Sequence, residues 1–212
     1  MPKNAQRYYP INLDITGRKC VVVGGGKVAL RKVRSLLDAG GRVALISPKV
    51  ATPLPKSNAL RAVRRKYRAG DLKGAAIVIA ATDDPAVNRK VSRDARRRNI
   101  PVNVVDQPDL CTFIVPACVR RGGLTIAVST GGASPALAAR IRQEIEEKYG
   151  EEYGRLVELI GDLRDRVIRN VPDAAARKAM FEKMSSPEML KRLRAKGKQS
   201  MRAALRKLAG ER

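Results

Sequence analysis

A glycine-rich turn between an extended run and a helical run constrains the fold of this chain most. Residues 18–23 are rich in β-branched side chains, and Gly24-x-Gly26-x-x-Ala29 follows at once. Residues 28–37 then carry apolar side chains at helical spacing. In a strand–turn–helix unit, Gly24 permits the tight turn, Gly26 lets a pyrophosphate approach the backbone, and Ala29 allows close packing of the helix on the sheet. The alternative is a turn with a structural role only.

Extended and helical runs continue to alternate beyond this turn. Further strands are expected at residues 42–47, 75–81 and 101–105, with a helix over 85–98 before the last of them. Residues 49–60 read as irregular, and a basic run follows at 61–68. Alternation of this kind predicts parallel β-α-β units. We therefore expect an α/β fold that begins with a Rossmann-like parallel sheet domain over residues 1–113.

The pattern changes after residue 106. Two extended runs, 112–119 and 124–128, flank a turn at 120–123 and predict a hairpin, and a helix should run from Ser134 to about Tyr149. The remainder is helical in pattern, with a break near Pro172. These features predict a small α+β region over residues 114–150 and a helical C-terminal domain over residues 151–212.

Composition narrows the chemistry. The chain has 44 Lys and Arg against 20 Asp and Glu, a formal net charge of +24, and no histidine. A surface of this charge attracts nucleic acid, anionic lipid or a small substrate dense in carboxylates or phosphates, although the charge could also serve solubility alone. The lack of histidine removes Ser-His-Asp and Cys-His nucleophiles and His-based metal sites. Proton transfer is left to Asp, Glu, Lys, Tyr or a thiol, and no metal site is expected.

Cysteine usage and the chain start bear on the compartment. The three cysteines show no C-x-x-C spacing, which predicts reduced thiols. Residues 1–10 contain no apolar signal region, and no apolar run approaches ~20 residues. We therefore expect a cytoplasmic protein without a membrane partner.

Four positions should share one edge of the sheet. Gly24, Ser47, Thr82-Asp83 and Asp106 each follow a predicted strand, and the carboxyl ends of parallel strands open onto the ligand crevice. Asp83 could instead be a helix N-cap, and Asp106 a turn residue before Pro108.

The end of the second strand departs from the dinucleotide-binding pattern. Ser47-Pro48-Lys49 stands where an Asp or Glu would bind the ribose hydroxyls. Ser47 could still bond a ribose and Lys49 could accommodate an extra phosphate. NAD is the expected cofactor, and NADP is not excluded.

A second anion site is expected before the helix at 134–149. Residues 129–135, Ser-Thr-Gly-Gly-Ala-Ser-Pro, combine small side chains with a helix start and should expose free amides at a positive helix end. The alternative is a flexible loop with an ordinary N-cap.

Four motifs carry a family resemblance. Residues 22–32 (VVGGGKVALRK), 80–84 (AATDD), 103–106 (NVVD) and 127–135 (AVSTGGASP) occur in this order. Together they closely resemble the precorrin-2 dehydrogenase family, which includes the amino-terminal module of bifunctional and trifunctional sirohaem synthases. The likeness extends over about residues 6–190.

The resemblance implies a homodimer built from a Rossmann domain, a central dimerisation region and a helical C-terminal domain. It implies that Lys27-Val28 and Pro48-Lys49 lie against the dinucleotide, that Asp106 is the key catalytic aspartate, and that Ser129-Thr130 contributes a hydroxyl to the substrate pocket.

The expected function is NAD-dependent oxidation of precorrin-2 to sirohydrochlorin in sirohaem biosynthesis. The substrate is a tetrapyrrole polycarboxylate, for which Gly131, Arg120, Arg121 and Arg140 are further candidate contacts. Asp106 would act as general base or orient the macrocycle. Insertion of Fe²⁺ as a second activity stays open, whereas the length predicts that no methyltransferase module is present. The alternatives are a basic nucleic-acid-binding protein and a non-catalytic NAD-sensing domain; the ordered motifs favour the enzyme without a nucleic-acid partner.

Overall fold

The computed structural model describes residues 8–208, and the chain divides into two compact units after Val115. The predicted end of the first domain, residue 113, falls just before this division. The boundary predicted after residue 150 lies inside the second unit and stays a prediction. Residues 1–7, part of the segment on which the predicted compartment rests, lie outside the described residues.

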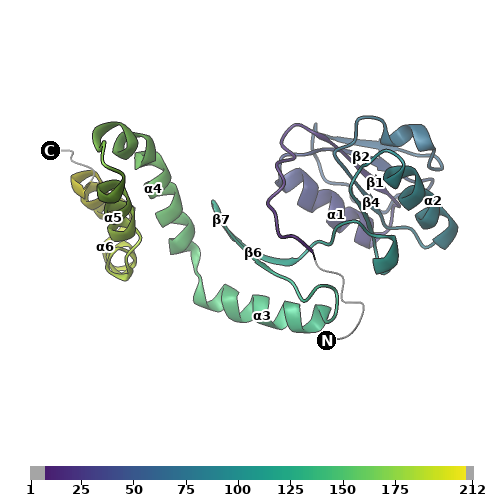
Figure 1. Ribbon diagram of the computed structural model, residues 1–212. Helices are drawn as coiled ribbons and strands as arrows, with labels where there is room; N and C mark the ends of the chain where they lie inside the picture. The colour runs from purple at the N-terminus through teal and green to yellow at the C-terminus, as the bar shows by residue number, and fades with distance from the viewer. Residues whose placement is uncertain (1–7, 209–212) are drawn as a thin grey trace. The chain divides into compact units, whose positions relative to one another are not determined.

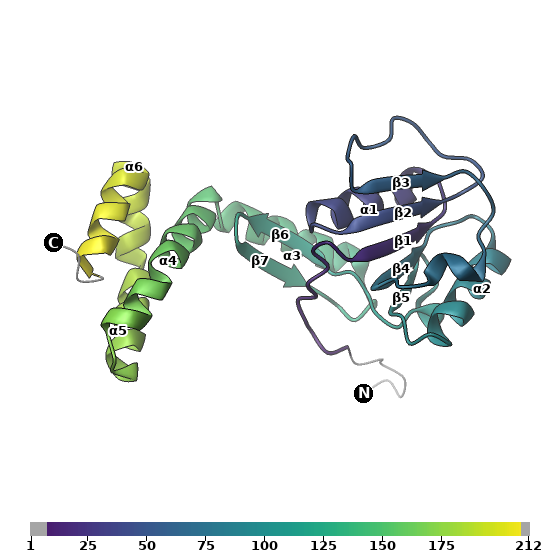
Figure 2. The same cartoon turned by 90° about the horizontal axis from the view of Figure 1, so that it is seen from above.

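The first unit is built on a five-stranded parallel sheet of order β3-β2-β1-β4-β5 (Figure 2). The strands are β1 (Lys19–Val23), β2 (Arg42–Ile46), β3 (Leu60–Val63), β4 (Ile77–Ala80) and β5 (Val102–Val104). Four of them confirm the predicted strands. The prediction of irregular structure followed by a basic run missed β3. That strand pairs only with β2 at the sheet edge and leaves Arg61 and Ala62 exposed, so it has no continuous apolar run.

Helices cover both faces of this sheet (Figure 1). Val21 and Val23 of β1 pack in the same cluster as residues of α2 (Pro85–Arg96), whereas Cys20 and Val22 pack with residues of α1 (Lys27–Asp38). Side chains that alternate between two buried faces explain why the central strands read as unbroken apolar runs. The predicted Rossmann-like α/β fold is confirmed.

The carboxyl ends of the strands are aligned. Val23 pairs with both Ile46 and Ala80, Ile46 pairs with Val63, and Ala80 pairs with Val104. From β1 the chain continues to β2 and β3 on one side of β1, and then crosses to β4 and β5 on its other side. The point where the strand order reverses therefore lies beside β1. Ligands of open α/β sheets bind at such a point.

The second unit, as far as residue 208, contains one hairpin and four helices. Strands β6 (Ala117–Arg121) and β7 (Leu124–Val128) are antiparallel. The predicted hairpin is confirmed, but the turn expected at 120–123 was too long, because Arg120 and Arg121 belong to β6 and pair with β7. Gly122, at φ 52°, and Gly123 form the two-residue turn.

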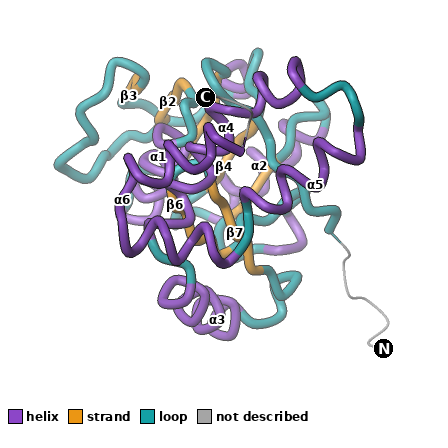
Figure 3. The backbone as a smooth tube through the Cα atoms, turned by 90° about the vertical axis from the view of Figure 1, so that its left-hand side faces the viewer, coloured by secondary structure: helices purple, strands orange, loops and turns teal. Residues whose placement is uncertain are grey.

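The helices are α3 (Pro135–Lys148), α4 (Glu151–Asn170), α5 (Ala174–Met184) and α6 (Pro187–Leu208). Helices α4, α5 and α6 share one apolar cluster that includes Leu159, Leu163, Met184 and Leu193, and they appear in purple in Figure 3. The break predicted near Pro172 is confirmed. Over residues 8–208, none of the helices has the length and hydropathy needed to cross a membrane.

Candidate functional site

A cavity of about 1080 Å³ opens at the carboxyl edge of the sheet in the first unit. Its walls come from the segments that follow β1, β2, β3 and β4 and from the first turns of α1 and α2. The cavity brings together every residue predicted to bind the cofactor: Gly24, Gly26, Lys27, Val28, Ser47, Pro48, Lys49, Thr82 and Asp83.

The three glycines of the turn have different environments. Gly24 has φ +121°, and a Cβ there would lie 2.1 Å from the carbonyl oxygen of Ala81. A Cβ on Gly25 would lie 1.9 Å from the carbonyl oxygen of Lys49. A Cβ on Gly26 would meet nothing within 4 Å. The protein itself therefore requires glycine at the first two positions, whereas the third keeps space open beside the backbone, as the sequence predicts for a pyrophosphate.

The N-terminus of α1 carries no side-chain cap. Gly26 is the N-cap residue, and its carbonyl accepts the first helical bond from Leu30. Helix α2, in contrast, is capped by Asp84, whose Oδ1 accepts from the amides of Ala86 and Val87. The first-turn amides of α1 and the positive end of its dipole are therefore available to an external anion.

Two predicted contact residues use their hydroxyls within their own loops. Ser47 is buried and donates to the carbonyl oxygen of Lys49 at 2.6 Å. Thr82 Oγ1 lies within hydrogen-bond distance of Asn88 Oδ1 and accepts from the amide of Asp84. Both hydroxyls stabilise the conformation of the cavity wall. Because the hydroxyl proton of Ser47 is already donated to Lys49, Ser47 could bind a ribose hydroxyl only as an acceptor.

The N-cap of α2 bears on the alternative role suggested for Asp83. Asp84, not Asp83, is the N-cap residue, and Asp83 is exposed on the cavity wall. The interpretation of Asp83 as a helix cap is therefore wrong. Its predicted contact with the cofactor stays a prediction.

A loop after β3 supplies wall residues that the sequence prediction missed. Arg65 forms a bidentate pair with Asp71, with distances of 2.8 Å and 2.6 Å, and Asp71 also accepts from the amide of Arg68. The hydrogen bonds from Arg65 hold the pKa of the Asp71 carboxyl below its ordinary value. The basic run at 61–68 was the only sequence signal, and its pairing with Asp71 could not be read from charge alone.

Tyr67 anchors the same loop against α2. Its hydroxyl donates to Asp94 at 3.0 Å in the protein interior, and burial, reinforced by this bond to a carboxylate, raises the pKa of Tyr67 far above its ordinary value. Lys90 Nζ lies 6.0 Å from the centre of the Tyr67 ring. Lys66, Tyr67 and Lys90 all line the cavity.

The cavity favours anions. Its lining contains four lysines, Lys27, Lys49, Lys66 and Lys90, and two aspartates, of which Asp84 already accepts two amide hydrogen bonds. Uncapped amides at one end and lysines around the wall suit a dinucleotide. Within residues 8–208, the cavity included, no group of three His, Cys, Asp or Glu side chains could hold a metal ion.

Asp106 lies just outside the residues that line the cavity. It follows β5, is exposed, and has φ 59°, a conformation that Asp adopts more readily than most residues. Thr82 lies two residues beyond Ala80 and Asp106 two beyond Val104, and these strand residues are paired. Asp106 is thus one strand beyond Thr82 on the same edge. The Gln107 amide donates to Val104 O, so Asp106 also occupies a turn.

The arginines predicted to bind substrate belong to the second unit. Arg121 is largely buried, donates to the carbonyl oxygens of Tyr149 and Glu146, and pairs with the carboxylate of Glu151. It therefore joins the end of α3 to the start of α4, a structural role that the sequence prediction did not anticipate. Arg120 is exposed on β6, and Arg140 is exposed and pairs with Glu144.

The loop at 129–135 is held by its own hydroxyls. Ser129 Oγ accepts from the amide of Gly131, Thr130 Oγ1 accepts from the amide of Ser134, and Ser134 Oγ caps α3 through the amide of Leu137. The N-cap alternative is confirmed for Ser134. The anion site at Ser129, Thr130 and Gly131 stays a prediction.

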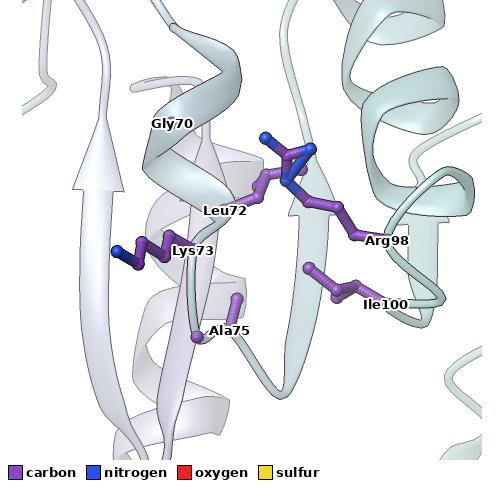
Figure 4. A pocket seen from close by; sticks show the side chains of 7 residues that line it. Gly70, Leu72, Lys73, Ala75, Arg98 and Ile100 are labelled. Atoms are coloured by element: carbon purple, nitrogen blue, oxygen red, sulfur yellow. The ribbon is translucent and has the colours of Figure 1, made fainter.

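A smaller cavity of about 430 Å³ lies at the opposite edge of the sheet (Figure 4). Buried Leu72 and Ile100 form its floor, and Arg98 extends over them. Its residues precede β4 and β5, so it is separate from the crevice at the carboxyl ends.

Comparison with known proteins places the first unit in a family. Residues 11–117 match the family model described as putative NAD(P)-binding. The chain belongs to this family. Residues 121–148 match the central region of sirohaem biosynthesis proteins, and residues 152–208 match the sirohaem synthase dimerisation region. The predicted resemblance is confirmed over both units.

Individual relatives agree with this membership. The chain is 45% identical over 179 residues to the sirohaem synthase of Methylococcus capsulatus and 46% identical over 176 residues to that of Methylobacillus flagellatus. These matches cover 83% and 82% of this chain and 38% of each relative. The chain thus spans about two fifths of the length of the curated relatives it matches.

A solved structure resembles the whole fold. SirC, a precorrin-2 dehydrogenase, matches 94% of this chain and 100% of its own with a TM-score of 0.72 and 26% sequence identity.

Proposed function

We propose that this chain oxidises precorrin-2 to sirohydrochlorin with NAD as the hydride acceptor. The observation that carries the proposal is the single cavity that gathers the glycine turn, the loop after β2 and the loop after β4 at the switch point of the sheet. The sirohaem-type regions that follow it, and the likeness to SirC, support precorrin-2 as the substrate.

Different residues bind the cofactor and act on the substrate. Gly26 and the free amides of α1 hold the pyrophosphate, and the loops after β2 and β4 hold the two ends of the dinucleotide. When bound, the dinucleotide accepts the hydride that leaves a carbon of the macrocycle. Asp106, an exposed carboxylate one strand beyond the cavity wall, accepts the proton that is lost or orients the macrocycle through its pyrrolic N–H groups.

The charge and the second unit complete the proposal. The net charge of +24 attracts a substrate that carries an acetate and a propionate on every pyrrole-derived ring. Exposed Arg120 and Arg140, with Ser129, Thr130 and Gly131, are the proposed partners of these carboxylates. The match to a dimerisation region supports a homodimer as the active form.

The test is a direct assay with a matched pair of variants. Incubation with precorrin-2 and NAD should produce NADH and the sirohydrochlorin spectrum together. Asp106→Asn should lower kcat by roughly 10²- to 10⁴-fold, the usual contribution of a general base, without changing the Kd for NAD. Asp109→Asn, an exposed carboxylate three residues further along the same loop and outside the cavity lining, is the control for a general loss of negative charge.

Each alternative function has its own outcome. A sensing domain would bind NAD but form no NADH, and a nucleic-acid-binding protein would lose bound nucleic acid steeply with added salt. A normal kcat for Asp106→Asn would remove this residue from the mechanism. Repeating the assay with Fe²⁺ after sirohydrochlorin has formed tests insertion of the metal as a second activity.

A further inference from the structure

We infer that Lys49 and Lys66 form a subsite for the 2′-phosphate of a dinucleotide, so that the cavity accepts NADP as well as NAD. The inference rests on the proposed function, because it concerns the ribose end of the same cavity.

The two lysines occupy equivalent positions on neighbouring strands. Ile46 at the end of β2 pairs with Val63 at the end of β3. Lys49 and Lys66 each follow three residues beyond their member of this pair, and both line the cavity. In dinucleotide-binding folds, the end of the second strand is the part of the site that contacts the ribose hydroxyls.

The segments after β2 and β3 contribute no carboxylate to the described lining of the cavity. The position that would hold an Asp or Glu in an NAD-specific site is occupied by Ser47, Pro48 and Lys49. Ser47 already donates its hydroxyl proton to Lys49 O, so it offers the ribose no donor. The two aspartates of the lining, Asp83 and Asp84, both follow β4. The carboxylates that contact the loop after β3 are engaged, Asp71 with Arg65 and Asp94 with Tyr67.

Both lysines have anchored backbones and exposed side chains. Lys66 lies between Arg65, which is held by Asp71, and Tyr67, which is held by Asp94. The carbonyl of Lys49 is held by Ser47 and lies directly against Gly25. Anchored backbones lower the entropy that must be lost when the two ammonium groups converge on one phosphate.

The other two lysines of the cavity are placed differently. Lys90 lies over the Tyr67 ring, and Lys27 begins α1 beside the pyrophosphate position. A variant at either position should therefore change the affinities for NAD and NADP together.

Calorimetric titration of the full chain with NAD, NADP, 2′,5′-ADP and 5′-AMP tests the subsite without any turnover. We expect NADP to bind at least as tightly as NAD, and 2′,5′-ADP more tightly than 5′-AMP. Lys49→Ala and Lys66→Ala should each weaken NADP about tenfold, which is ~1.4 kcal/mol, and change NAD less than about twofold. Lys73→Ala, an exposed lysine outside this cavity, is the matched control.

The outcomes separate the subsite from the proposed function. NAD binding with much weaker NADP binding, or a double variant that leaves the NADP-to-NAD ratio unchanged, would overturn the subsite alone. Failure of both dinucleotides to bind would overturn the dinucleotide site and the proposed function with it. Lys49→Asp gives a further check, because a carboxylate there should reverse the ratio in favour of NAD.

Discussion

Replacing Gly26 with alanine should separate folding from dinucleotide binding. The backbone at Gly26 has φ −79°, which any residue adopts, and a Cβ there would meet no protein atom within 4 Å. The cost to stability is that of alanine at an N-cap position, about 0.5–1 kcal/mol. The methyl group would, however, occupy the space through which a pyrophosphate reaches the backbone. Overpacking of about 1–3 kcal/mol corresponds to a ~5- to 150-fold rise in Kd.

Gly25→Ala is the matched control on the same turn. Its Cβ would lie 1.9 Å from a backbone oxygen and 2.7 Å from Ser47 Oγ, so the loop after β2 must move. Thermal unfolding should therefore show a larger drop in Tm for Gly25→Ala than for Gly26→Ala, at roughly 2–4 °C per kcal/mol for a chain of this length. Calorimetric titration then gives the Kd of each folded variant. If Gly26→Ala binds NAD as tightly as the parent, the pyrophosphate does not lie against this residue and the proposed orientation of the cofactor is refuted.

Two further predictions concern stability and reactivity. Asp71→Asn should destabilise the protein by about 1–3 kcal/mol in urea at pH 7, because Arg65 loses a charged partner. Since the folded-state pKa of Asp71 is lowered, its contribution is full above the ordinary Asp pKa of about 3.9 and is lost as the pH falls through the folded value. The difference between parent and variant should therefore shrink below about pH 4, and a constant difference would contradict this assignment. Burial raises the pKa of the Cys20 and Cys111 thiols, so iodoacetamide at pH 8 should modify half-exposed Cys118 first, as mass spectrometry would show. Equal labelling rates before and after denaturation would argue against buried thiols.

The sequence predicts the central strands and the glycine turn because backbone geometry and burial dictate them. β1 and β4 are buried on both faces and read as apolar runs, whereas β3 is an edge strand with exposed Arg61 and reads as part of a charged segment. The same logic gathers the predicted cofactor residues, since every parallel strand delivers the residue that follows it to one edge.

Side-chain partners are harder to predict because they are distant in sequence. Tyr67 finds Asp94, 27 residues away, and Arg121 finds Tyr149, 28 residues away. Nothing in the local pattern distinguishes Arg121, which is committed to two helix ends, from Arg120, its exposed neighbour. A basic run indicates attraction to anions, but only the packing shows which of its members are already paired.

The cavity combines recognition by backbone atoms with recognition by exposed side chains, and the two differ in how far substitutions affect stability. The pyrophosphate end is made of backbone, and Gly24 and Gly25 are also needed for the fold, so this end cannot vary without loss of stability. The ribose end is made of the exposed side chains of Lys49 and Lys66 on anchored loops. Substitutions there leave the packing untouched. Preference between NAD and NADP can therefore change at the ribose end alone, while the glycine turn keeps the dinucleotide in the same orientation.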